Sequence, residues 1–358
     1  MRSAEGRASG SCDLAKRVRL HCTVLHLPKR ARYEGPPGDH FDGRRFFNPG
    51  LEERGFRDFW RWMKTRDKGF WRDLPGGPGP APPPSVPGLR VTWVGHSTVL
   101  LQVAGLNLLT DPIWSERASP VSWAGPRRHR APGIALDDLP PIDTLLLSHD
   151  HYDHLDRPTL RALAKHHHPV LVTPLAVGKR LRRLPWSAIH ELDWWDEVSL
   201  PGSTVTAVPA RHFSGRGLFD RARTLWAGYV VSSREGDVYF AGDTGGGPHF
   251  AAIARRFPAL RLALLPIGAF RPRWFMGPVH LSPRDALEAF ETLGASTAVA
   301  IHHSTFELAD DGQDEAPDEL RRLLAARNDN RGTEASPPFC ILGFGKGRDV
   351  PAPEPAPR

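Results

Sequence analysis

The 358-residue sequence predicts a mixed α/β layered sandwich. Two groups of short β-type runs each lead into helical patterns, which favours packed layers of sheet and helix over an all-β barrel. The composition, 40% hydrophobic and 24% charged, is that of a globular chain and not of a fully disordered one. No repeat at a fixed short period is visible. The 34 Gly and 36 Pro residues therefore indicate many turns and no collagen-like helix.

The segment 1–88 is predicted to be an N-terminal extension, mostly irregular because its first half lacks an apolar period. A helix is expected near 56–71. Four apolar residues there share one helical face: Phe56, Phe59, Trp60 and Met63. The proline-rich segment 75–87 excludes regular structure, so it is expected to be an extended linker or a strap lying on the domain.

The layered domain is expected over residues 89–345, followed by a disordered, proline-rich tail at 346–358. Its strands are predicted at 90–95, 98–103, 106–110, 144–147, 170–172, 204–208, 228–232, 238–241, 262–266 and 297–301. Helices are predicted from Leu155 to Lys165 and from Pro283 to Leu293. Ser282 is placed to be the N-cap of the second helix, and Gly294 its stop signal.

Composition also limits the compartment and the partners. Cys12, Cys22 and Cys340 are too few and too scattered for a disulfide framework, which indicates a reducing compartment. No apolar run reaches the ~20 residues that a bilayer requires, and no signal peptide is predicted. We therefore expect a cytoplasmic protein, with contact to a membrane surface left open. The net charge of +7 is spread along the chain without a nucleic-acid module, so no nucleic-acid partner is expected.

The strongest motif follows the apolar run 144–147. It places His149, His151, Asp153 and His154 in the pattern H-x-H-x-D-H. Four fixed identities match by chance in roughly one window in 10⁵, which disfavours an accidental histidine-rich surface turn. His149 and His151 can converge on one ion, and Asp153 with His154 can reach a second. Imidazoles beside a carboxylate suit Zn²⁺ better than Ca²⁺ or Mg²⁺.

Two ions need more ligands than this motif supplies. His212, Asp243 and His302 each follow a predicted strand, and Asp243 lies among small residues where a carboxylate can bridge two metals. His303 competes with His302, because a strand ending one residue later would turn His303 to the metal. The run 166–168, three histidines without a nearby carboxylate, is interpreted as a solvated face.

The motif H-x-H-x-D-H together with His212, Asp243 and His302 resembles the metallo-β-lactamase superfamily, which implies a four-layer αββα sandwich. The segments 93–99, 110–120, 148–156 and 266–280 are similar to the N-acylphosphatidylethanolamine-hydrolysing phospholipase D branch, as is the short piece 45–49 in the extension. The resemblance covers most of residues 89–310.

The resemblance assigns the ligands in two sets bridged by Asp243. One zinc would be held by His149, His151 and His212, and the other by Asp153, His154 and His302. It also places Asp111 and His280 at positions that the family needs for activity. Asp153 and Asp243 are expected to be catalytic as well.

The residues by themselves leave the roles of Asp111 and His280 open. Asp111 opens an Asp-Pro turn, where local hydrogen bonding is an equal explanation, although a carboxylate that orients a metal-bound histidine is also sensible. His280 can equally be a packing residue before the helix at Pro283. His96, in a Gly-His-Ser-Thr turn, is interpreted as structural.

These observations predict a hydrolase with two Zn²⁺ ions or a similar divalent transition metal, acting through a metal-bridging hydroxide. The resemblance implies a phospholipase D-type phosphodiesterase for N-acylphosphatidylethanolamine-like lipids, with a phospholipid or another anionic phosphodiester as partner. The alternatives are a sugar-phosphate lactonase or another phosphodiesterase of the superfamily, and then a non-enzymatic metal-binding protein. The helix near 56–71 is expected to contact a membrane or, equally, to pack on the domain. The oligomeric state is left open.

Overall fold

The computed structural model describes residues 31–358 except 53, 218, 332–337 and 353–358. The expectations for residues 1–30, with Cys12 and Cys22, lie outside the described residues.

The sequence forms two seven-stranded sheets. The first contains, in spatial order, β14 (Gly347–Asp349), β1 (Leu89–Gly95), β2 (Thr98–Val103), β3 (Leu106–Thr110), β4 (Thr144–Leu146), β5 (Val170–Pro174) and β6 (Ala188–Leu192). The second contains β13 (Phe339–Cys340), β12 (Thr297–Ile301), β11 (Leu260–Pro266), β10 (Gly236–Phe240), β9 (Gly228–Ser233), β8 (Ser203–Val208) and β7 (Glu197–Leu200).

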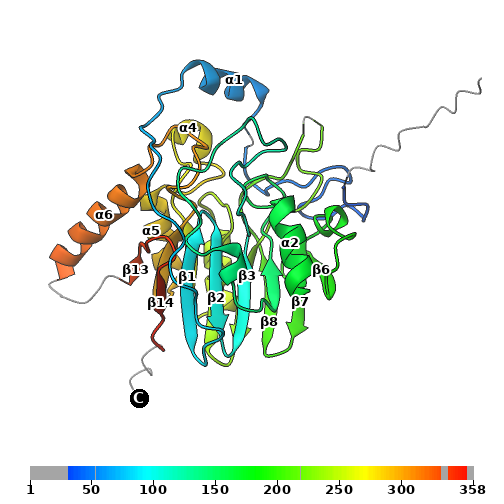
Figure 1. Ribbon diagram of the computed structural model, residues 1–358. Helices are drawn as coiled ribbons and strands as arrows, with labels where there is room; N and C mark the ends of the chain where they lie inside the picture. The colour runs from blue at the N-terminus through cyan, green and yellow to red at the C-terminus, as the bar shows by residue number, and fades with distance from the viewer. Residues whose placement is uncertain (1–30, 53, 218, 332–337, 353–358) are drawn as a thin grey trace, which may run out of the picture. The chain divides into compact units, whose positions relative to one another are not determined.

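The described residues also form the helices α1 (Phe56–Lys64), α2 (Arg157–His167), α3 (His249–Arg256), α4 (Arg273–Met276), α5 (Pro283–Leu293) and α6 (Glu315–Arg331), with short 3₁₀ turns η1 (Leu136–Asp138) and η2 (Gly178–Arg180). Figure 1 shows α1 and α4 beyond the ends of the strands. α2 packs on the first sheet, whereas α3, α5 and α6 pack on the second. The predicted αββα sandwich is therefore confirmed.

Three apolar clusters hold the layers together. The cluster between the sheets joins residues of both, such as Trp93 of β1 and Tyr229 of β9. A second cluster lies between the second sheet and its helices and includes Tyr239 of β10 and Phe290 of α5. A third lies beneath α2, around Leu160. The inner strands therefore bury side chains on both of their faces, as expected for strands in the middle layers.

Strand direction brings the candidate site residues to one edge. β3, β4 and β5 are parallel to one another, so their carboxyl ends share an edge of the first sheet. In the second sheet β10, β11 and β12 are parallel, and β8 runs in the same direction because it is separated from β10 by the antiparallel β9. The loops that follow β3, β4, β8, β10 and β12 therefore carry the site.

Several boundaries differ from the prediction. The first helix ends at Lys64 and does not reach residue 71, because the chain turns there to follow the domain surface. α2 begins at Arg157, two residues after the expected start, with Pro158 in its first turn. The predicted capping of α5 is confirmed, since Ser282 Oγ accepts a hydrogen bond from the Asp285 N–H and Gly294 has φ 63°.

Short edge strands escaped sequence analysis. β6 and β7 each contain a glutamate and are mostly half buried or exposed, so they lack the apolar run that marks an inner strand. β14 lies within the tail expected to be disordered, but its backbone pairs with β1 from Arg90 to Thr92. Main-chain pairing with an existing edge requires little of the side chains, which explains why no sequence pattern indicates these strands.

The proline-rich segment 75–87 contains no helix or strand and lies as a strap on the first sheet. Gln102 Nε2 donates to the Pro83 carbonyl at 2.8 Å, and Asn107 Nδ2 donates to the Pro84 carbonyl at 2.8 Å. Proline has no N–H to donate, so these two contacts use the carbonyls of the strap. In the part of the chain that the structure describes, no helix has the length and apolar character needed to cross a membrane.

Helix α1 is docked on the domain through one aromatic residue. Trp62 is buried, its ring lies 5.0 Å from that of Phe275, and its Nε1 donates to Asp310 Oδ2 at 2.9 Å. Arg66, just after the helix, donates from Nε to Asp310 Oδ1 at 2.6 Å. The Asp310 carboxylate therefore anchors both the helix and the segment that follows it, while the opposite face of α1 stays exposed.

We expect Asp310→Ala to release α1 without unfolding the sandwich. Hydrogen bonds to a charged group contribute about 1.5–3 kcal/mol each, so amide hydrogen exchange over residues 57–64 is expected to become about tenfold faster or more. Exchange in β10 and β11 should not change. Asp318→Ala, which removes an exposed carboxylate paired with Arg321, is the matched control. Equal exchange of α1 in the two variants would contradict this anchoring role.

Candidate metal centre

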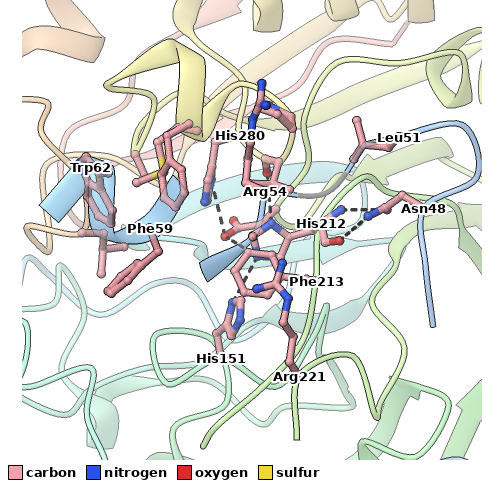
Figure 2. A pocket seen from close by; sticks show the side chains of 18 of the residues that line it. Asn48, Leu51, Arg54, Phe59, Trp62, His151, His212, Phe213, Arg221 and His280 are labelled. Atoms are coloured by element: carbon pink, nitrogen blue, oxygen red, sulfur yellow. Dashed lines mark hydrogen bonds and ion pairs between the residues drawn. The ribbon is translucent and has the colours of Figure 1, made fainter. Parts of the chain in front are cut away.

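The loops at the shared sheet edge gather histidines and aspartates from five separate parts of the chain. They form the floor of a pocket with a volume of about 730 Å³. Figure 2 shows His151, His212 and His280 pointing into this pocket, although they lie on different loops. All the metal ligands expected from the sequence lie together here, and Asp111 lies directly behind them.

One group of nitrogen donors consists of His149, His151 and His212. His149 Nε2 lies 2.8 Å from His151 Nδ1, which in turn lies 3.2 Å from His212 Nε2. These three nitrogens lie within 4.8 Å of one another, close enough for one ion to contact all of them. Asp243 Oδ2 lies 3.7 Å from His212 Nε2, so its carboxylate borders this group.

The second group surrounds the carboxylates of Asp153 and Asp243. His154 Nε2 lies 3.1 Å from Asp153 Oδ2 and 3.2 Å from Asp243 Oδ2. His302 Nε2 lies 3.5 Å and 3.2 Å from the same two oxygens. Asp243 thus borders both groups of donors, as a bridging carboxylate must.

The donor set fits metal ions of the borderline class. Several buried atoms here make no hydrogen bond within the described part of the chain: His154 Nε2, Asp243 Oδ1, His280 Nδ1 and both ring nitrogens of His302. A buried polar atom without a partner is costly, and most such atoms in proteins are satisfied. Imidazole nitrogens and carboxylate oxygens in this arrangement are ligands that Zn²⁺ or a similar ion accepts.

Burial and the two carboxylates divide the histidines into two kinds. Burial lowers the pKa of His151 to about 4 and that of His212 to about 3, so both are neutral and able to donate a lone pair. Burial also acts on His302, but the charge of Asp243 and the closeness of both carboxylates to its Nε2 outweigh it and raise the pKa of His302 to about 9. The pKa of His154 is raised well above its ordinary value, because the charges of Asp243, Asp153 and Asp111 outweigh burial.

Asp111 orients two of the histidines from behind. Its Oδ2 accepts hydrogen bonds from His154 Nδ1 at 2.6 Å and from Ser148 Oγ at 2.6 Å. With its proton donated to Asp111, Ser148 Oγ accepts the Nδ1–H of His149 at 2.9 Å. Both imidazoles therefore present an unprotonated Nε2 edge when they bind a metal. The structure thus favours the orienting interpretation of Asp111 over simple turn formation.

His96 has a role at the site that the sequence did not indicate. Its Nε2 lies 2.9 Å from Asp153 Oδ2, and its carbonyl accepts the backbone N–H of His302 at 2.9 Å. The only signal was the Gly-His-Ser-Thr turn, which is equally compatible with a structural histidine. Its position at φ 54° turns the ring inward, and this backbone state could not be read from the residue types.

The structure resolves the ambiguity between the paired histidines. His302, at φ 58°, turns its ring to the carboxylates, whereas the ring of His303 stacks on Trp93 with 4.4 Å between centroids. His280 lines the pocket, with Nδ1 4.0 Å from Asp243 Oδ2, so it is a pocket residue and not a packing residue of α5. The histidines at 166–168 lie at the end of α2, exposed or half exposed and away from the site.

Comparison with known proteins identifies the class. Residues 106–303, more than half of the chain, match the family model of the β-lactamase superfamily domain. The chain therefore belongs to this superfamily, and its fold and donor set place it among the metallo-β-lactamase-type, metal-dependent hydrolases. The similarity includes the loops after β4, β8, β10 and β12, which carry the candidate ligands.

Relatives at higher identity narrow the comparison. The chain is 41% identical over 254 residues to an uncharacterised protein of Mycobacterium tuberculosis, covering 70% of this chain and 67% of that protein. It is 37% identical over 258 residues to an N-acyl-phosphatidylethanolamine-hydrolysing phospholipase D of Caenorhabditis elegans, covering 69% and 72% of the two chains. It is 29% identical over 238 residues to a metal-dependent hydrolase of Methanopyrus kandleri, covering 66% and 93%.

A solved structure supports the fold independently. The isothiocyanate hydrolase from Delia radicum gut bacteria superposes with a TM-score of 0.57 at 24% identity, covering 72% of this chain and 98% of that one. At this level the similarity describes the fold and not the substrate.

We expect zinc binding to the metal-free protein to release protons at pH 7. His302 has a pKa of about 9, and the pKa of His154 is raised well above its ordinary value. Both are therefore protonated at pH 7 and must lose those protons to become ligands. Calorimetry in buffers of different ionisation enthalpy should therefore give a buffer-dependent heat corresponding to about two protons or more. Because His302 is already deprotonated above its pKa, the release should fall as the pH rises through about 9.

His302→Gln provides the control, because it should abolish the change near pH 9. A heat independent of buffer at pH 7 in the unmodified protein would contradict the protonated state of this pair.

Proposed function

We propose that the protein is a dinuclear zinc phosphodiesterase of the phospholipase D type, acting on N-acylphosphatidylethanolamine-like lipids. The observation that carries this proposal is the composition of the pocket: a polar floor of histidines and aspartates meets a wall of apolar side chains. The wall consists of Phe56, Phe59, Trp62, Ala269, Phe275, Met276 and Leu308. A lipid presents the matching pair of features, an anionic phosphodiester and acyl chains.

The ligand sets follow the two donor groups. One zinc would be held by His149, His151 and His212, the other by Asp153, His154 and His302, and Asp243 would contact both. When bound, such a pair supplies a nucleophile derived from water at neutral pH and stabilises charge on a phosphoryl oxygen. Another divalent transition metal with the same ligand preferences would fit the same donors.

The protein groups around this pair bind and orient the phosphodiester. His280 lies on the pocket side of Asp243, and burial lowers its pKa to about 3, so a neutral imidazole faces the substrate. We assign it contact with the phosphodiester, to whose oxygens the neutral ring can donate a hydrogen bond from its N–H. Asp111 stays behind the ligands and sets the direction of His154 through the 2.6 Å hydrogen bond.

The apolar wall distinguishes this proposal from a sugar-phosphate lactonase of the same fold. A sugar phosphate offers hydroxyl groups along its length and would leave them unpaired against Phe59, Trp62 and Phe275. An acyl chain instead gains about 0.8 kcal/mol for each buried CH₂ group. The name of the Caenorhabditis elegans relative, a phospholipase D for N-acyl-phosphatidylethanolamine, supports the same choice.

We further propose that the enzyme works in the cytoplasm and meets its substrate at a membrane surface through α1. Phe56 is 75% exposed and Trp60 is 49% exposed, on the helix whose buried residue Trp62 forms part of the pocket wall. Arg57 and Lys64 on the same helix are attracted to anionic lipid, and exposed aromatic rings settle at the interface. Trp62 belongs to the packing of α1 and not to its membrane face.

We expect the zinc-loaded protein to hydrolyse N-acylphosphatidylethanolamine to phosphatidic acid and an N-acylethanolamine. Asp243→Asn should lower kcat more than about 100-fold, because the loss of a ligand exceeds the 10–100-fold that the loss of an outer partner costs. Asp137→Asn, at an exposed carboxylate outside the pocket lining, is the control. The assay is run in parallel on bis-p-nitrophenyl phosphate and on lactones. Metal-dependent turnover of a lactone without turnover of the lipid would overturn the proposed substrate.

The membrane contact is tested with Trp60→Ala, which lies outside the pocket lining. Removing a half-exposed indole forfeits ~1 kcal/mol of interfacial burial, so co-sedimentation with phosphatidylglycerol vesicles should fall about fivefold. Turnover of bis-p-nitrophenyl phosphate should be unchanged. Trp60→Phe, which keeps an aromatic ring, should retain most of the binding. Equal vesicle binding by the unmodified protein, Trp60→Ala and Trp60→Phe would show that α1 does not form the membrane contact.

A further inference from the structure

The backbone of His212 is held by a side chain from the N-terminal segment. Asn48 Nδ2 donates to the His212 carbonyl at 2.7 Å, and Asn48 Oδ1 accepts the His212 N–H at 3.2 Å. Figure 2 shows the Asn48 amide beside His212, with both interactions marked. One primary amide thus satisfies both polar groups of one residue. Asn48 is itself buried, with 4% of its surface exposed.

These two hydrogen bonds are specific to the position of His212. The residue follows β8 in an irregular loop, and its N–H and carbonyl make no backbone–backbone hydrogen bond within the described part of the chain. The neighbouring Arg211 is held separately, through its N–H to Thr244 Oγ1 at 2.9 Å and its carbonyl to the Gly245 N–H at 2.8 Å. Asn48 therefore supplies the two backbone hydrogen bonds that a neighbouring strand would supply in a sheet.

The ring of His212 is held independently of its backbone. Its Nδ1 donates to the Val279 carbonyl at 3.1 Å, which leaves Nε2 unprotonated and turned toward His151 and Asp243. The position of Nε2 is thus set by two constraints, the peptide clamped by Asn48 and the ring directed by Val279. Ligand atoms in metal sites must be placed within a few tenths of an ångström, so both constraints matter.

Packing holds Asn48 in place. Phe41 and Phe46 form a β-bridge and are buried against Trp226 and Leu225 in the loop that also carries His212. The Phe46 N–H donates to the Ala222 carbonyl at 2.8 Å. The segment before Asn48 is therefore bound to the same loop, and the clamp is part of a packed unit.

We propose that Asn48 is a positioning residue of the metal centre: its amide fixes the peptide of His212 and thereby the place of Nε2. The N-terminal segment from 31 to 48 then completes the hydrolytic site. This inference rests on the proposed function in one respect, that His212 is a metal ligand.

Asparagine suits this clamp chemically. Aspartate has nearly the same shape but offers only acceptors, so it would repel the His212 carbonyl while still accepting its N–H. Alanine removes both hydrogen bonds and leaves two buried peptide groups without partners. The partners that orient metal ligands typically change metal affinity or activity 10–100-fold when they are removed.

The experiment compares zinc affinity, by competition with a chromophoric chelator, for the full chain and for Asn48→Asp, Asn48→Ala and Asn107→Ala. Asn107 is the matched control: its buried amide donates to the carbonyls of Pro84 and Pro141, both at 2.8 Å, beneath the proline-rich strap. We expect one of two binding steps, that of the ion held by His212, to lose about 10–100-fold in affinity in both Asn48 variants. Asn107→Ala should keep both steps, even if it lowers the melting temperature. The isosteric Asn48→Asp keeps the test decisive if Asn48→Ala does not fold.

Cobalt substitution adds a spectroscopic readout. We expect the visible absorption of one Co²⁺ to change in Asn48→Asp and that of the second to be retained. Unchanged zinc affinity and an unchanged cobalt spectrum in Asn48→Asp would overturn the inference and leave the proposed function intact. Equal losses of affinity in Asn48→Asp and Asn107→Ala would also overturn it, because the effect would then be general destabilisation.

The proposed function fails in a distinguishable way. If the unmodified chain binds two metals but does not hydrolyse the lipid, the proposed substrate is wrong and the proposed role of Asn48 is unaffected. An unmodified chain that binds less than about one metal would overturn both.

Discussion

The structure depends on the burial of Asp153 and Asp243 within one cluster of imidazoles. Two carboxylates removed from water repel each other, and this is tolerable only when positive charge lies between them. His154 and His302 supply that charge, each within 3.5 Å of both carboxylates. The same arrangement explains the raised pKa of His302 and the lowered pKa of Asp243. Metal ions would replace these protons as the positive partners, which makes metal binding and proton release two aspects of one equilibrium.

The cluster is held from outside by residues from three separate segments that precede the ligands in the sequence. Asp111 directs His154, His96 contacts Asp153, and Asn48 clamps the peptide of His212. These contacts approach from the first sheet, from the turn between β1 and β2, and from the N-terminal segment. Since each ligand loop is irregular, the side chains behind it supply the hydrogen bonds that strands supply elsewhere. The geometry of the site is thus a property of the whole domain and not of the H-x-H-x-D-H loop alone.

Substrate selection and metal chemistry are divided between different parts of the molecule. The edge loops of the sandwich provide the donors, which the superfamily match between residues 106 and 303 includes. The apolar wall instead uses α1 and the segment around α4, joined through Trp62, Phe275 and the Asp310 anchor. The N-terminal segment therefore contributes twice, with Asn48 at the metal centre and with α1 at the lipid wall. Such a division allows one hydrolytic centre to serve different substrates.

The sequence alone determined the layered fold, the inner strands and the metal motif, because apolar runs and ligand spacing are local properties. It also placed His212, Asp243 and His302 at strand ends, where parallel strands must bring them together. It could not reveal the edge strands β6, β7 and β14, which form by backbone pairing, or the inward turns of His96 and His302, which depend on left-handed backbone states. The pairing of Asn48 with His212 spans 164 residues. Only the tertiary structure decides such contacts, because no local pattern of residues specifies which distant peptide a buried amide will meet.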